Sequence, residues 1–153
     1  TFTGNTALAF NAGDWSKLTA SVASTYVAAG LTQISPSSAV AVAQAKLLIG
    51  SGLSFSGSVT LSDAKISLAD YNALKGISGV AFSSTASLSD TTISLSNAKA
   101  LIAAGKSGLL NTNIKITDAT VTAADADALV LRASKAYEAA FPFARISQPK
   151  IGA

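Results

Sequence analysis

The sequence predicts an α/β fold, a short solenoid of βα repeats with parallel strands, helices on one side and a helical N-terminal cap. One pattern occurs three times, marked by Asp63, Asp90 and Asp118, with a period of about 27 residues. Each copy changes from strand-like to helical periodicity. A unit of this size buries its apolar face only against stacked neighbours, and strands joined by a helix are parallel. A compact α/β sandwich of the same elements is the alternative.

Each copy begins with a short strand of alternating character. These strands are predicted at residues 59–62, 86–89 and 114–117, and each is followed by its Asp. Three residues after the Asp comes a β-branched apolar residue, directly followed by a hydroxyl residue. These pairs are Ile66-Ser67, Ile93-Ser94 and Val121-Thr122. Each hydroxyl is predicted to be the N-cap of a helix, because its oxygen can accept a bond from a helix N–H.

The helices are predicted from capping and spacing. A polar residue three positions after each cap forms a variant of the capping box: Asp70, Asn97 and Asp125. A leucine for the buried stripe stands seven positions after each cap: Leu74, Leu101 and Leu129. Gly76 and Gly105 are predicted to end the first two helices, where a left-handed residue is favoured. Gly79 and Gly108 are predicted to begin the return to the next strand.

A degenerate earlier copy is predicted from Ile34. Its helix has Ser35 as the N-cap and Pro36 at the first helical position, with Val42 at the leucine position. Ahead of this copy, Asp14 is predicted to cap one helix that ends at Gly30. Its apolar positions are Trp15, Leu18, Val22 and Tyr26.

The predicted organisation is a single repeat domain over residues 1–153. It comprises an N-terminal cap at 1–33, βα repeats at 34–133 and a C-terminal cap or docking tail at 134–153. The tail contains Phe141-Pro142-Phe143, which can form a lid on the last repeat or dock onto a neighbouring subunit. The lid is the simpler interpretation, because a solenoid needs its last sheet edge covered.

Composition narrows the function classes. The chain has no Cys and no His, so thiolate, zinc–thiolate and histidine chemistry are excluded, and a non-enzymatic protein is expected. The net charge is +3 with scattered basic residues, which favours no nucleic-acid interface. The longest apolar run, residues 39–49, is too short to insert into a membrane. With 12% charged residues, the chain resembles secreted proteins in composition, and an extracellular or cell-surface location is expected.

The three repeated aspartates are the candidate metal site. Stacking would place Asp63, Asp90 and Asp118 in a column, where calcium could relieve the repulsion between carboxylates. The competing interpretation is that each Asp accepts local backbone hydrogen bonds, as in an Asx-turn, and that no cofactor is bound. Two further acids, Asp125 and Asp127, are explained by helix capping and the helix dipole.

Hydroxyl residues of the strands are the candidate ligand-binding surface. Stacked strands would present them as a flat array, interrupted by Lys115, that could bind a glycan or ice. The array consists of Thr60, Ser62, Ser87, Ser89 and Thr117. A solvated strand face is the competing interpretation.

The segments 61–74 and 116–129 resemble repeat segments of large secreted bacterial surface proteins of the adhesin or surface-layer type. The resemblance is carried by Leu61-Ser62-Asp63 through Leu74 and by Ile116-Thr117-Asp118 through Leu129, and it extends over about residues 34–133. It implies a passive extracellular role in adhesion, a surface layer or a filament, with self-association, and it transfers no site residues. The alternative expectation is a module that binds a glycan or ice.

Overall fold

The computed structural model describes residues 7–110, 114–127 and 129. The fold is mixed α/β, and every strand pairing among these residues is parallel. The chain divides into two compact units, residues 1–90 and 91–153. The part of the chain described contains no helix of the length and apolarity needed to cross a membrane. The predicted tail at 134–153 lies outside the described residues.

The first described element of the first unit is a strand, which the predicted helical N-terminal cap did not include. The strand β1 (Ala7–Phe10) pairs with β2 (Gln33–Pro36), and β2 pairs with β3 (Ser54–Phe55) in one three-stranded sheet. An aromatic cluster packs beside this sheet. The Phe10 and Trp15 ring centroids lie 4.9 Å apart, and those of Trp15 and Phe55 lie 6.3 Å apart.

The single helix predicted after Asp14 is in fact two helices, α1 (Ala12–Trp15) and α2 (Ala20–Ala28). The cap of α1 is Asn11, whose side chain accepts the Gly13 and Asp14 N–H groups, while Asp14 bonds back to the Asn11 N–H. Asp14 therefore sits inside the first turn as the capping-box partner, a role that acidic residues share with the cap itself.

The degenerate copy is also out of register with the prediction. Ser35 and Pro36 lie in β2, because their segment pairs with β1, and the helix α3 (Val42–Gly50) starts after Ala41. Val42 is thus the first helical residue. The position that corresponds to Leu74 is occupied by Leu48, which is fully buried.

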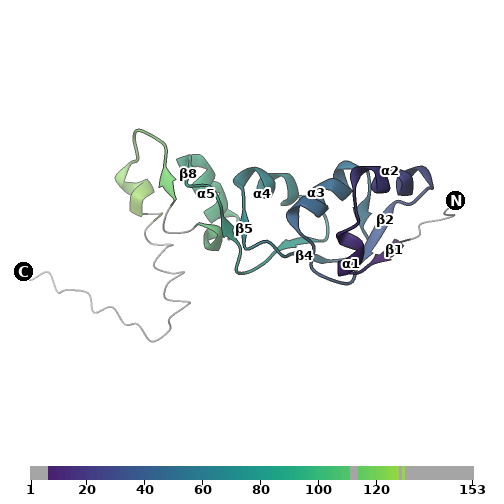
Figure 1. The fold of residues 1–153 in the computed structure, drawn as a ribbon. Helices are drawn as coiled ribbons and strands as arrows, with labels where there is room; N and C mark the ends of the chain where they lie inside the picture. The colour runs from purple at the N-terminus through teal and green to yellow at the C-terminus, as the bar shows by residue number, and fades with distance from the viewer. Residues whose placement is uncertain (1–6, 111–113, 128, 130–153) are drawn as a thin grey trace, which may run out of the picture. The chain divides into compact units, whose positions relative to one another are not determined.

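The remaining part of the first unit has the predicted strands and helix together with two short strands that the sequence did not predict. The strand β4 (Val59–Leu61) pairs with β6 (Val80–Phe82), a strand that the sequence did not predict. The short strand β5 (Lys65–Ile66) precedes the helix α4 (Leu68–Leu74) and pairs with β7 (Ser87–Leu88). Helices α2, α3 and α4 follow one another along the same side of these strands, α2 against α3 and α3 against α4 (Figure 1).

One glycine prediction in this unit is wrong. Gly76 does not have a positive φ, and the left-handed residue after α4 is Gly79, at φ 80°. A Cβ on Gly79 would lie 2.5 Å from the backbone oxygen of Gly57, so the close approach of two backbones requires a glycine.

The second unit repeats the strand–helix–strand order of β5, α4 and β7, with a 3₁₀ helix where the first unit has β6. The strand β8 (Thr92–Ile93) precedes the helix α5 (Leu95–Ala103), which ends in the left-handed Gly105, as predicted. The short 3₁₀ helix η1 (Ser107–Leu109) leads towards β9 (Lys115–Ile116), which pairs with β8. Residues 123–127 are helical. The three predicted repeat strands and the helix starts after Ser67, Ser94 and Thr122 are confirmed.

Candidate functional site

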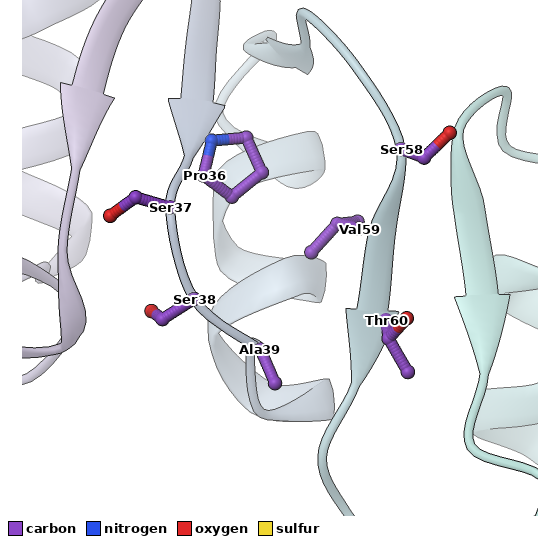
Figure 2. Close-up of a pocket in the computed structure, with 7 residues that line it drawn as sticks. All are labelled: Pro36, Ser37, Ser38, Ala39, Ser58, Val59 and Thr60. Atoms are coloured by element: carbon purple, nitrogen blue, oxygen red, sulfur yellow. The ribbon is translucent and has the colours of Figure 1, made fainter.

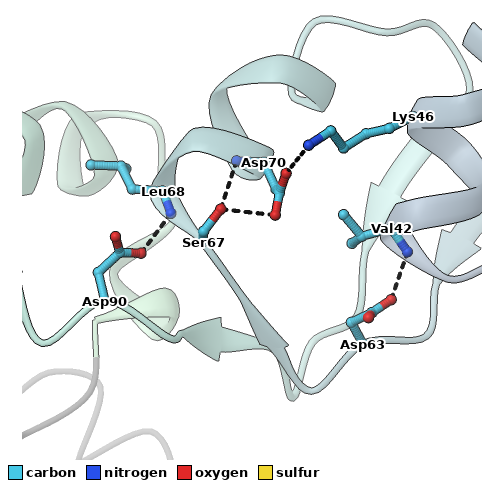
Figure 3. A network of polar contacts seen from close by, with 7 residues as sticks. All are labelled: Val42, Lys46, Asp63, Ser67, Leu68, Asp70 and Asp90. Carbon is cyan, nitrogen blue, oxygen red and sulfur yellow. Dashed lines mark hydrogen bonds and ion pairs between the residues drawn. The ribbon is translucent and has the colours of Figure 1, made fainter. Parts of the chain in front are cut away.

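Each of the three repeated aspartates binds the first N–H of a helix in the preceding repeat. The Val42 N–H donates to Asp63 Oδ2 at 2.7 Å, and the Leu68 N–H donates to Asp90 Oδ2 at 2.6 Å (Figure 3). In the second unit, the Leu95 N–H donates to Asp118 Oδ2. The partners are 21 to 23 residues apart in the sequence. We call these three bonds the inter-repeat caps.

The inter-repeat caps satisfy groups that a helix cannot satisfy alone, because its first four N–H groups have no acceptor within the helix. At the start of α4, two side chains accept these N–H groups. The Ser67 hydroxyl accepts the Asp70 N–H at 3.0 Å, and Asp90 accepts the Leu68 N–H. In α3 the cap residue is Ala41, which has no polar side-chain atom. The start of α3 therefore depends on Asp63.

Two lysine–aspartate ion pairs continue the same pattern between successive helices. Lys46 in α3 bonds to Asp70 in α4, and Lys99 in α5 bonds to Asp125. The hydrogen bond from Lys46, and then that from the Ser67 hydroxyl, hold the pKa of Asp70 below its ordinary value. Lys99 and then Thr122 lower the pKa of Asp125 in the same way.

The aspartate geometry corrects one interpretation and leaves the other open. Local Asx-type bonds were expected for Asp63, Asp90 and Asp118, but the N–H groups that they bind belong to remote residues. Residues 7–110, 114–127 and 129 hold no group of three or more acidic side chains placed to bind a metal. Calcium binding at the aspartates stays a prediction.

The candidate hydroxyl array is distributed over more than one sheet. Thr60 lies in β4 and Ser62 directly follows it. Ser87 lies in β7, and Ser89 directly follows that strand. The strands β4 and β7 are in separate two-stranded sheets of the first unit. Thr117 follows β9 in the second unit. Two of the hydroxyls donate to a backbone carbonyl of the neighbouring segment: Ser87 to that of Ala64 at 3.4 Å and Thr117 to that of Ile93 at 3.3 Å.

The hydroxyl residues lie in different sheets because of the strand register. Successive sequence copies repeat with a period of about 27 residues, as Asp63 and Asp90 show. The offset between paired strands is shorter than this period, because Lys65 pairs with Ser87 and Val59 pairs with Val80. A strand therefore pairs with a different element of the next copy, not with its own equivalent. Stacking of equivalent strands was the premise of the predicted array, and the first unit contradicts it.

One of the array residues does line a pocket. The pocket has a volume of about 370 Å³ and lies between the segment after β2 and the start of β4 (Figure 2). Its lining residues are Pro36, Ser37, Ser38, Ala39, Ser58, Val59 and Thr60. Figure 2 shows Val59 directed towards the gap, whereas the Ser37 and Ser38 oxygens point away from β4. The Ser38 Oγ is buried and finds no hydrogen-bond partner within the described residues.

The inter-repeat caps were missed at the sequence level, although a signal was present. Each Asp stands at a constant four positions before an N-cap, which directs attention to its own helix. The better signal is Ala41, an N-cap position without a capping side chain, which requires an acceptor from elsewhere. Comparison with known protein families, curated proteins and solved structures gives no match to this chain.

Proposed function

We propose that this chain is a non-enzymatic structural or adhesive protein of a bacterial surface, in which βα repeats of a single domain stack as a solenoid and the chain associates with itself. The observation that carries the proposal is the set of three inter-repeat caps. Each repeat completes the helix start of the repeat before it, so a repeat is built to be extended by another of its kind.

The use of the acidic side chains supports a structural role. Asp63, Asp90 and Asp118 accept helix N–H groups, and Asp70 and Asp125 form ion pairs. The bonds from Lys46 to Asp70 and from Lys99 to Asp125 lower the pKa of these two carboxyl groups and so favour their ionised form. A general acid needs the opposite, a carboxyl group that keeps its proton near neutral pH.

Self-association is tested by light scattering and negative-stain electron microscopy of the purified chain over a range of concentrations. We expect ordered assemblies whose mass grows with concentration. Parallel samples with calcium and with a chelator test the predicted aspartate site. A monodisperse monomer under all conditions would refute self-association, and equal behaviour with calcium and chelator would remove the calcium prediction.

A glycan-binding module is the second candidate, favoured by the pocket beside Thr60. Glycan-array binding that is lost in Thr60→Trp and kept in Ser62→Trp would support it, because Ser62 follows the same strand but does not line the pocket. No binding by the unaltered chain, or equal loss in both variants, would exclude this pocket as the binding site.

A further inference from the structure

One apolar position before each of the helices α3, α4 and α5 is buried against a strand of the next repeat. Val40, Ile66 and Ile93 are only 1%, 2% and 4% exposed. Their partners across the ladder are Leu61, Leu88 and Ile116, in that order. Val121 occupies the same position before the last described helix, yet it is 39% exposed.

The three incoming strands share one sequence, Leu or Ile, then Ser or Thr, then Asp. The hydroxyl residue donates its backbone N–H to the carbonyl of the buried apolar residue in all three cases. These bonds run from Ser62 to Val40 at 2.9 Å, from Ser89 to Ile66 at 2.8 Å and from Thr117 to Ile93 at 3.0 Å. The interface between repeats is therefore the same each time: an apolar pair, a ladder bond and the Asp cap.

The segment 120–122 carries the receiving half of this interface. Val121 has the β-branched apolar side chain, and Thr122 accepts the Asp125 N–H at 3.2 Å, as Ser67 and Ser94 do for their helices. The matching residues Lys65–Ile66 and Thr92–Ile93 are strands, whereas residues 120 and 121 are not. A strand needs a pairing partner, and no described residue pairs with this segment.

We propose that the segment 120–122 is a docking edge for an extended strand of the sequence Leu/Ile–Ser/Thr–Asp, added in parallel as in the repeats. The three strands of this sequence in the chain already pair with the repeats before them, so the docking strand belongs to another polypeptide that carries this sequence. This is strand addition, in which ladder bonds give affinity and the alternating side chains give specificity. The inference deepens the proposed function, since it names the surface through which a repeat is added.

The probe is a synthetic peptide with the sequence of residues 84–92, which contains Leu88-Ser89-Asp90, tested against the full chain by fluorescence anisotropy and by NMR. We expect saturable binding with a Kd of about 1 mM or tighter and with shifts centred on Val121. A peptide with Ala in place of the Asp should bind several-fold more weakly. No saturation, or equal binding of both peptides, would overturn the proposal.

The chain offers a matched control for the receiving side. Val27 in α2 is also 39% exposed and lies in the other unit. Val121→Ser is expected to weaken peptide binding about tenfold or more, whereas Val27→Ser should leave it unchanged. Equal effects of the two substitutions would reduce the binding to general apolar contact and refute the docking edge.

The two proposals can fail separately in these experiments. Peptide binding by a chain that stays monomeric would keep the docking edge and reject self-association. Assemblies that form while the peptide fails to bind at Val121 would keep self-association and reject this edge.

Discussion

The helices α1 and α3 lie in the same unit but begin in different ways. The start of α1 is satisfied within its own turn by Asn11 and Asp14. The start of α3 follows Ala41 and is satisfied by Asp63, which belongs to the next repeat. The difference shows two ways of stabilising a small element: the N-terminal segment is completed locally, whereas the repeats are completed by their neighbours.

The cores of the two regions differ in the same sense. The N-terminal sheet has four paired positions between β1 and β2 and an aromatic cluster beside it. The β5–β7 and β8–β9 pairs have only two positions each and bury mainly Leu, Ile and Ala. Such short pairs are marginal by themselves, so shared caps and stacked side chains contribute a larger fraction of the stability.

The largest expected effect is in the aromatic cluster. Trp15→Ala removes a side chain that is 4% exposed, and we expect a loss of about 3–5 kcal/mol in the free energy of unfolding. Urea unfolding followed by far-UV circular dichroism measures it. The Trp15 Nε1 finds no hydrogen-bond partner among the described residues, so Trp15→Phe should cost clearly less. Equal losses in the two variants would contradict the packing account.

Gly79→Ala tests the tight return after α4. The left-handed conformation alone costs an alanine about 1–2 kcal/mol, and here the Cβ also meets the Gly57 backbone. Gly105→Ala is the matched control, because Gly105 has φ 70° but nothing within 4 Å of the added Cβ. Gly79→Ala should therefore lower the midpoint of thermal unfolding more than Gly105→Ala, and the reverse order would contradict the close approach.

The inter-repeat caps are compared by replacing two equivalent aspartates. Asp63→Ala leaves the first N–H of α3 without a side-chain acceptor, and we expect a loss of about 1–2 kcal/mol. Asp90→Ala should cost less, because the Ser67 cap of α4 remains. Asp63→Asn keeps an acceptor oxygen and should recover most of the loss. Denaturant unfolding of the three variants gives the order, and a larger loss for Asp90→Ala would contradict it.

The smallest effect is the pH dependence of the Lys46–Asp70 pair. The folded-state pKa of Asp70 lies below the ordinary value of 3.8, so the pair stabilises the fold above that pH and loses this contribution as the pH falls through the lowered pKa. The pair is partly exposed, which limits it to roughly 0–1 kcal/mol. Lys46→Gln should move the Asp70 pKa upward in an NMR titration, and an unchanged pKa would contradict the ion pair.

Local rules predicted the parts of the fold that depend on neighbouring residues. The caps Ser67, Ser94 and Thr122 and the buried residues Leu74 and Leu101 follow from spacing along a single helix. The first helix was placed wrongly because Asn11 and Asp14 are both good capping residues, and the sequence does not say which one is the cap. The strand β1 was missed because a strand is stabilised by its partner.

The inter-repeat caps and the dispersed hydroxyls depend on strand register, and this explains why the sequence did not predict them. The period of the sequence copies suggests that Asp63, Asp90 and Asp118 lie above one another. The shorter offset between paired strands instead places each of them at a helix start of the previous repeat. That offset is the combined length of a helix and of the return after it, which for α4 includes the unpredicted β6.

The dependence of one repeat on the next is tested most directly by amide hydrogen exchange at single residues in Asp63→Ala. We predict that the Val42 N–H, which donates to Asp63, exchanges much faster, while the Leu68 and Leu95 N–H groups keep their protection through Asp90 and Asp118. Unchanged protection at Val42 would show that the aspartate does not hold the helix start and would contradict the account.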